Sequence, residues 1–287
     1  NDNWRYRSHS DDHGTHGLHL RWQRESERVD KHLYLRQGEN VVYSQHVLSG
    51  FSGPMNPGHH ATLQFPDRPG SGRISVSPFV LGATTPLPVE DPTKGGYSSL
   101  KHNSRFTDLR QVPLLTGEMT DLSRYPARRG FEDIVLVMND PKLPLGWVAV
   151  TFPEECHVWF TLKDPQVLTG TLMWLSNGGR HYAPWSGRHV NVMGLEDLTS
   201  YFAYGLAEAA APNPVSALGL RTCLHLQPST PLAINYIQGI AKVPAGFDRV
   251  ASITPLDGDR VRLVAENGLS TEVPVKHSFL QAKPGAC

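Results

Sequence analysis

The chain has 287 residues, of which 39% are hydrophobic and 19% are charged; this is the composition of an ordinary globular protein and not of a disordered one. Lysine plus arginine and aspartate plus glutamate number 27 each, so the formal net charge is zero. This balance gives no electrostatic reason to expect nucleic acid or an anionic membrane surface as a partner.

The amino-terminal stretch, residues 1–17, is polar and rich in histidine, so we expect a lead-in followed by one domain over residues 18–287. No repeat and no long Pro/Ser-rich linker marks a further boundary, and all-β chains of this size occur as single domains. Residues 41–48 predict the first clear strand and residues 73–80 a second. Residues 82–105 predict a long loop, a feature that is often functional.

Strands dominate the rest of the chain. Their segments are rich in β-branched or aromatic residues and are bounded by Pro, Gly, Asp or Asn, which is typical of short strands joined by turns. The segments are residues 133–138, 146–152, 157–162, 169–175, 221–226, 231–243, 248–254, 260–265 and 270–275. The pair Asn267-Gly268 between two apolar runs predicts a hairpin, so we expect the carboxy-terminal fifth to be a meander.

One helix is expected, over residues 195–209. Its apolar residues recur at three- and four-residue steps, which is the spacing that lines one face of a helix. They are Leu195, Leu198, Phe202 and Leu206. Many strands and so few helical segments predict an all-β fold with one or two short helices, for which strand counting allows a jelly roll as well as another large sandwich.

The segment 174–196, WLSNGGRHYAPWSGRHVNVMGLE, has the composition of a sugar-binding site. The apolar C–H face of a sugar ring stacks on Trp or Tyr, and its hydroxyls pair with Arg, Asn or Glu, which offer several hydrogen bonds each. The alternative is a tight Gly-rich turn with a buried Trp and with arginines that face water. The expected partner is therefore a small sugar or sugar derivative, with no nucleic acid and no membrane.

Several motifs of this chain resemble the aldose 1-epimerase (galactose mutarotase-like) superfamily. They are SNGGR at 176–180, PW at 184–185, GR at 187–188 and GLE at 194–196, preceded by GHHATL at 58–63 and DLSRYP at 121–126. Ala61 stands where the family's G-x-H-P-T segment has proline. The order of the motifs agrees with that of the family over roughly residues 45–255.

The resemblance implies a β-supersandwich, in which large antiparallel sheets stack face to face and the sugar lies on a concave sheet surface. It also implies an isomerase that interconverts sugar anomers. The early Asn-Arg pair and the NHxYFNL block of the better-known galactose mutarotases are absent from this sequence, and their glutamate lies nearer the carboxy terminus than Glu196. Galactose itself is therefore doubtful as the substrate.

Anomer interconversion needs one group that takes a proton from the anomeric hydroxyl and another that gives a proton to the ring oxygen. We expect Glu196 to be the base and His60 the acid, because a histidine with a pKa near ~6.5 still carries its proton close to neutral pH. Glu196 as a helix-start charge and His60 as a core histidine remain alternatives. The candidate substrate-binding residues are Arg180, Trp185, Arg188, Asn177, His181, His59 and His102.

A non-catalytic carbohydrate-binding protein on the same fold would contain the same residue types, and it remains open. A paired-carboxylate glycosidase would need two acids that flank one bond. The nearest second acid, Asp197, follows Glu196 directly and points elsewhere.

A metal-dependent sugar-processing enzyme is a further alternative, because the chain has 14 histidines. The series His13, His16 and His19 has the spacing of one helical face. Adjacent His59 and His60 on a strand would point to opposite faces, and no HExxH or CxxC motif occurs. We therefore assign no metal and no cofactor, and we expect a soluble protein, with a cytoplasmic location favoured over a periplasmic or secreted one.

Overall fold

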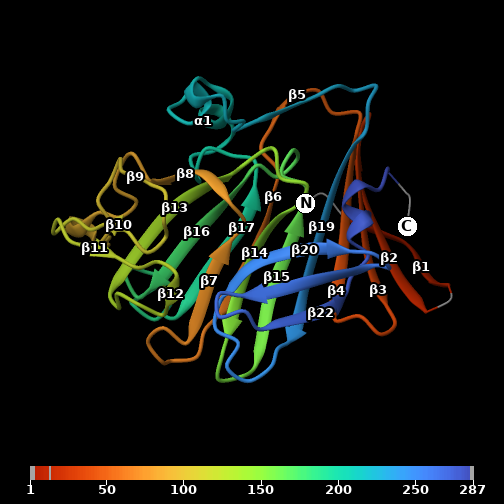
Figure 1. Cartoon of the computed structure of the whole chain (residues 1–287). Helices are drawn as coiled ribbons and strands as arrows, with labels where there is room; N and C mark the ends of the chain where they lie inside the picture. Colours follow the sequence, from red (N-terminus) through yellow and green to blue (C-terminus); the bar gives the residue numbers. More distant parts are fainter. Residues whose placement is uncertain (1–3, 13, 285–287) are drawn as a thin grey trace.

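Residues 4–12 and 14–284 are described by the structure, a computed structural model (Figure 1). Its three main antiparallel sheets have nine, six and three strands. The nine-stranded sheet has the order β1-β2-β3-β4-β19-β15-β14-β7-β12. Its strands are β1 (Arg5–Asp12), β2 (Thr15–Arg24), β3 (Glu27–Arg36), β4 (Val41–Ser49), β19 (Leu232–Lys242), β15 (His157–Lys163), β14 (Gly146–Phe152), β7 (Gly72–Val76) and β12 (Arg124–Tyr125).

The six-stranded sheet has the order β6-β17-β16-β13-β8-β9, with β6 and β9 at its edges. Its strands are β6 (Gly58–Gln64), β17 (Val192–Leu198), β16 (Gly170–Asn177), β13 (Phe131–Asn139), β8 (Phe79–Thr84) and β9 (Arg105–Phe106). The three-stranded sheet consists of β20 (Val250–Leu256), β21 (Arg260–Ala265) and β22 (Ser270–Pro274).

The remaining elements are short. Two strand pairs are β5 (Gly53–Met55) with β18 (Leu224–Leu226), and β10 (Val112–Pro113) with β11 (Met119–Thr120). The helical turns are η1 (Pro92–Lys94), α1 (Leu206–Ala210), η2 (Ser216–Leu218) and η3 (His277–Gln281). Among the described residues, no helix has the length and apolar character needed to cross a bilayer.

The main core lies between the two large sheets. Side chains alternate between the faces of each strand, so Val135, Met173 and Leu195 of the six-stranded sheet meet Ile74 and Val150 of the nine-stranded sheet. A second core fills the space between the other face of the nine-stranded sheet and β20–β22. The nine-stranded sheet is therefore a middle layer, and the six-stranded sheet is an outer layer with one face turned away from the main core.

This outer face of the six-stranded sheet is apolar at one end and polar at the other. Leu136 and Leu172 are covered by the segment between β17 and β18, which contains α1. Beyond this cover, the strand registers place Glu132, Trp174 and Glu196 on the same outward face of β13, β16 and β17. The uncovered end is where the candidate site residues gather.

The all-β prediction is confirmed, and each of the segments predicted to be a strand contains one. The bounds predicted for 146–152 and 260–265 are those of β14 and β21. The Asn267-Gly268 turn joins β21 to β22, and the pairing β20-β21-β22 confirms the predicted meander. β1 and β2 pair within the stretch expected to be a lead-in, so residues 5–12 belong to the nine-stranded sheet.

The segment 73–80 forms two strands and not one. β7 ends at Val76 and belongs to the nine-stranded sheet, whereas β8 begins at Phe79 and belongs to the six-stranded sheet. Pro78 between them has no amide hydrogen to give to a ladder. The Ser77 hydroxyl accepts a hydrogen bond from Asn139 at 2.9 Å, which holds the chain where it passes from one sheet to the other.

The helix predicted over 195–209 was wrong for most of its length. β17 extends to Leu198, and only Leu206–Ala210 is α-helical. Leu195 packs in the main core, while Leu198 packs in the cluster on the outer face. Because Leu195 packs on one face of this strand and Leu198 on the other, the two leucines do not alternate with polar residues, and their spacing resembles that of a helix.

Candidate functional site

Glu196 and His60 lie opposite each other on neighbouring strands. β17 pairs with the edge strand β6, and the register places the two residues directly across from one another. Oε1 of Glu196 lies 3.3 Å from Nε2 of His60, whose Nδ1 lies 3.1 Å from the Thr62 hydroxyl. The His60 side chain is 59% exposed and that of Glu196 is 15% exposed. A solvent-facing imidazole therefore adjoins a carboxylate that is mostly withdrawn from water.

The environment of Glu196 favours its protonated form more than water would. Burial raises the pKa of the carboxyl group, and the charge of a protonated His60 partly opposes that shift. Gly194, two residues earlier on the same face, leaves room for this carboxylate. A Cβ atom at position 194 would lie 2.8 Å from Oε1 of Glu196 and 3.2 Å from Cβ of Trp174. Because Gly194 has no side chain, the carboxylate of Glu196 and the indole of Trp174 can both pack over it.

Trp174 is the centre of an aromatic group beside this pair. It lies across from Gly194 on β16, and its ring centroid is 6.0 Å from that of His60 in an edge contact. His189 stacks on Trp174 at 5.3 Å, and Trp185 meets Trp174 at 6.2 Å and His189 at 5.1 Å. Indole rings of this kind offer the apolar surface on which a sugar face stacks.

Arg180 joins the aromatic group to a buried acid. Its guanidinium carbon lies 5.5 Å from the Trp174 centroid and 5.0 Å from the Trp185 centroid. Its Nε donates to Glu90 at 2.7 Å, and the Tyr182 hydroxyl donates to the other oxygen of Glu90 at 3.0 Å. Arg180 is thus already engaged by protein groups.

The long loop after β8 delivers Glu90 to this position. Gly96 forms a bridge with Arg180, and the amide of His181 donates to the carbonyl of Gly95 at 2.8 Å. Gly179 lets the segment before Arg180 lie against β13, because a Cβ atom there would lie 2.3 Å from the backbone nitrogen of Glu132. The loop predicted over 82–105 therefore contributes a side chain to the site region.

Glu132 is a second buried carboxyl group of the site, and it was not among the sequence candidates. It is 1% exposed and accepts hydrogen bonds from Nε1 of Trp174 at 2.5 Å and from the Ser176 hydroxyl at 3.0 Å. Burial raises its pKa to about 7 against the opposing charge of Arg180, whose Nε is 3.7 Å away. The available signal was an acid that directly precedes an apolar strand.

The other predicted site residues lie in different places. His59 points into the space between the sheets, where it stacks on Tyr236 at 4.0 Å. The Asn177 side chain binds backbone groups. Its Nδ2 donates to the carbonyl of Ala127, and its Oδ1 accepts from the backbone amide of Asn191. Their roles in binding stay predictions.

Three further predicted side chains lie in loops. His181 is exposed and packs against Tyr97 with a centroid distance of 5.3 Å. Arg188 is exposed in the loop that carries Trp185. His102 is partly buried in the loop before β9, where its carbonyl accepts from Ser104. The assigned substrate contacts of these three residues remain predictions as well.

Comparisons with known proteins give a structural match only. No protein-family model matches the sequence, and a search of curated proteins finds no match. A candidate aldose 1-epimerase of Escherichia coli K12 superimposes with a TM-score of 0.54 over 84% of this chain and 69% of that one, at 14% identity. The chain has the galactose mutarotase-like fold.

Two other structures are similar to it. A galactose mutarotase related enzyme of Lactobacillus acidophilus gives a TM-score of 0.49 over 84% of this chain and 71% of that one, at 10% identity. A TPR-domain containing protein of Parabacteroides distasonis gives 0.50 over 89% of this chain and 38% of that one, at 8% identity. At such identities these two likenesses say nothing about activity.

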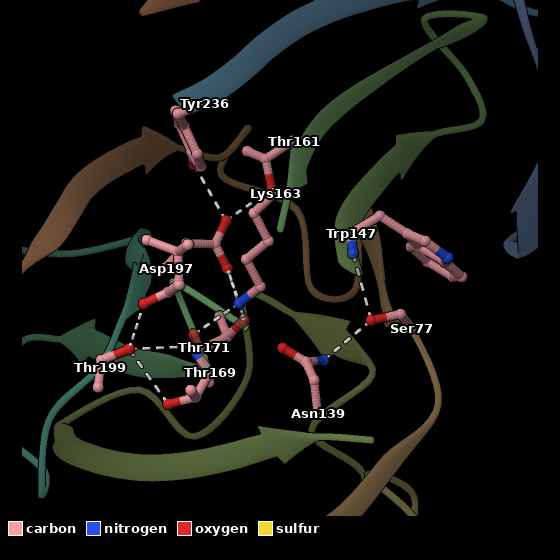
Figure 2. A network of polar contacts seen from close by, with 12 residues as sticks. Ser77, Asn139, Trp147, Thr161, Lys163, Thr169, Thr171, Asp197, Thr199 and Tyr236 are labelled. Carbon is pink, nitrogen blue, oxygen red and sulfur yellow. Dashed lines mark hydrogen bonds and ion pairs between the residues drawn. The ribbon is translucent and has the colours of Figure 1, made fainter. Parts of the chain in front are cut away.

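On this mutarotase-like fold, Asp197 lies behind the site and joins the two large sheets (Figure 2). It points to the opposite face of β17 from Glu196 and pairs with Nζ of Lys163 on β15 at 2.5 Å, with both side chains fully buried. The hydroxyls of Thr161 and Tyr236 donate to its other oxygen at 2.7 and 3.1 Å. These contacts fix Asp197, the residue next to Glu196, to the nine-stranded sheet.

Neither a metal site nor a disulfide is assigned. Among residues 4–12 and 14–284, no group of three or more His, Cys, Asp or Glu side chains is placed to hold a metal ion. Of the series His13, His16 and His19, His13 lies outside the described residues, and Nε2 of His19 lies 2.7 Å from Asp30. Cys156 and Cys223 are free thiols.

Proposed function

We propose that this protein interconverts the anomers of a sugar by general acid–base catalysis at Glu196 and His60. One observation carries the proposal. A carboxylate with a raised pKa and an exposed imidazole touch at 3.3 Å on an open sheet face, beside the indole of Trp174. The fold shared with a candidate aldose 1-epimerase is consistent with this chemistry.

The reaction needs a balanced pair of proton transfers. Glu196 takes the proton from the anomeric hydroxyl while the bond between the anomeric carbon and the ring oxygen breaks, and His60 gives its proton to that ring oxygen. The open-chain aldehyde rotates and closes by the reverse steps. Desolvation of Glu196 suits it to this task, because a base is most effective when its pKa lies near the working pH.

The test is anomer exchange measured by saturation-transfer NMR on a panel of neutral aldoses. Glu196→Gln keeps the shape of the side chain but removes the base, and it should lower the exchange rate at least about 100-fold. His60→Asn should lower the rate by a similar factor. Glu154→Gln is the matched control, because Glu154 is 69% exposed and pairs with Arg68 on the surface.

Unchanged exchange in Glu196→Gln would remove this residue from the mechanism.

Non-catalytic sugar binding is the second candidate function. The 59% exposure of the His60 side chain favours it, because active sites usually exclude water from their acid–base groups. Binding of a sugar from the panel, detected by calorimetry without faster exchange, would favour that function over catalysis.

A further inference from the structure

Ser176 connects Glu132 to His189, which is the second imidazole beside Trp174. Its hydroxyl lies 3.0 Å from Oε2 of Glu132 and 2.6 Å from Nδ1 of His189. Ser176 is fully buried and Glu132 is 1% exposed, so water does not compete for these contacts. The three side chains form a continuous hydrogen-bonded row from the interior to the aromatic group.

A hydroxyl has only one hydrogen, so the two contacts of Ser176 depend on each other. When Glu132 is ionised it can only accept, and Ser176 donates to it and accepts from a hydrogen on Nδ1 of His189. When Glu132 is protonated it donates to Ser176, which then donates to Nδ1, and the ring hydrogen lies on Nε2. Among the described residues, Nε2 of His189 has no hydrogen-bond partner, so this atom is free to meet a ligand.

We propose that His189 is a further catalytic residue of the site and that Ser176 relays protons between it and Glu132. The proposal rests on the proposed function, because it supplies a further acid–base group for anomer interconversion. Glu196 and His60 already contact each other at 3.3 Å. His60 makes an edge contact with Trp174, whereas His189 stacks on the same ring.

The relay conserves protons. With Glu132 ionised, Nε2 of His189 carries a lone pair and takes a proton from a sugar hydroxyl. The hydrogen on Nδ1 then passes to Ser176, and the hydroxyl hydrogen of Ser176 passes to Glu132. One proton has entered at Nε2 and one has been stored on Glu132, while His189 and Ser176 are neutral again. The reverse sequence returns the proton to the sugar hydroxyl when the ring closes.

The charges around Glu132, Ser176 and His189 allow both the ionised and the protonated form of Glu132. Burial raises the pKa of Glu132 to about 7, and burial together with the charge of Arg180 lowers the pKa of His189. The titratable groups that face the row are Arg180, Glu90 and Tyr182 from the loops, Tyr125 from β12, and Glu196 and His60 from the adjacent strands. Both forms of Glu132 are therefore accessible at neutral pH while His189 stays uncharged.

The tautomer of His189 provides a test that needs no substrate. Long-range ¹H–¹⁵N NMR on the full chain separates imidazoles protonated at Nδ1 from those protonated at Nε2, and His189→Asn identifies the signals of this ring. As the pH rises through about 7, neutral His189 should change from the Nε2-H form to the Nδ1-H form as Glu132 ionises. Ser176→Ala should abolish this change, and Glu132→Gln should abolish it as well.

A tautomer that stays constant with pH in the wild type, or that changes equally in Ser176→Ala, would overturn the relay. The kinetic arm uses the same sugar panel. Ser176→Ala should lower kcat about 10-fold with KM within about 2-fold, and His189→Asn should lower kcat about 100-fold. Ser75→Ala on β7 is the matched control, as Ser75 is also buried but lies in the other sheet.

The two arms separate the relay from the proposed function. If the wild type exchanges no sugar while the tautomer follows Glu132, the proposed function fails and the relay stands. If exchange depends on Glu196 but is unaffected by Ser176→Ala and His189→Asn, the proposed function stands and the relay fails.

Discussion

Glu132 occupies a small enclosure made by an indole, a hydroxyl and a guanidinium. The two hydrogen bonds from Trp174 and Ser176 and the nearby Arg180 stabilise the carboxylate, whereas burial stabilises the neutral acid. Burial is the larger effect, which is why the pKa rises to about 7. A carboxyl group that changes charge near neutrality is uncommon, because most carboxyl groups are ionised at this pH.

The burial of Glu132 predicts how the stability of the protein depends on pH. The pKa of Glu132 is higher in the folded protein than in the unfolded chain, so its contribution to stability is complete at pH values below about 4.5 and is lost as the pH rises through about 7. The loss amounts to about 3 kcal/mol. Glu132→Gln should remove this part of the pH dependence, as measured by urea unfolding at several pH values between about 5 and about 8. Equal pH profiles for wild type and variant would contradict the assignment.

At the scale of residues, sequence reasoning reached the side chains that lie on recognisable motifs. Glu196, His60, Arg180 and Trp185 were named from the segments that contain them, and the structure brings them to one region of the outer face. Glu132 was missed because an acid at the start of a strand usually faces water. Its burial depends on loops from distant parts of the chain, which no local pattern reveals.

β17 is the element that connects the site to the rest of the fold. Its alternation turns Glu196 outward to His60 and turns Asp197 inward to Lys163. Burial lowers the pKa of Lys163, and the Asp197 carboxylate opposes this shift. Since the inward pair also binds Thr161 and Tyr236 of the nine-stranded sheet, the position of the outward acid depends on a buried polar contact between layers.

Breaking that contact should be costly. Lys163→Met leaves Asp197 buried without its positive partner and should reduce the free energy of unfolding by about 3–5 kcal/mol. Lys163→Met combined with Asp197→Leu removes both charges and should recover part of the loss. Chemical denaturation of the single and double variants provides the measurement. A single variant as stable as the double one would show that the ion pair adds nothing to the joining of the sheets.

At the scale of elements, the sequence indicated where the strands lie better than it indicated which strands pair with each other. The hairpin β21–β22 follows from one Asn-Gly turn, so local sequence was enough. β4 pairs with β19 across almost two hundred residues, and the change of sheet at Pro78 is decided by which layer has room. Segments such as β17, which bury leucines on both faces, also lose the alternation on which strand prediction depends.

Across the whole molecule, two partly buried histidines mark the place where the layers meet beside β6. His46 belongs to β4 of the nine-stranded sheet and His59 to β6 of the six-stranded sheet, and their rings are 5.3 Å apart. Burial lowers the pKa of His46 to about 3 and that of His59 to about 4. Both are therefore neutral in the folded protein at pH values where the unfolded chain binds protons.

The fold should consequently weaken in mild acid. The pKa of each ring is depressed on folding, so stability is complete above about pH 6.5 and falls as the pH decreases toward about 4, by up to about 3 kcal/mol for each histidine. His59→Phe keeps an aromatic ring on Tyr236 and should make the decrease less steep. Thermal melting at about pH 7.5 and about pH 5 tests this, with His225→Phe on the exposed part of β18 as the control. Parallel decreases in all three proteins would contradict it.

Three ionisable side chains of the site and two of its aromatic ones stand on different kinds of backbone. Glu132, Glu196 and His60 are held by strands of the six-stranded sheet, whereas Trp185 and Tyr182 belong to the loop between β16 and β17. A mutant library confined to residues 181–188 would therefore reshape the surface beside Trp174 while these three ionisable groups stay in place. Under the proposed function, such a library would change the sugar preference and leave the Glu196–His60 pair as it is.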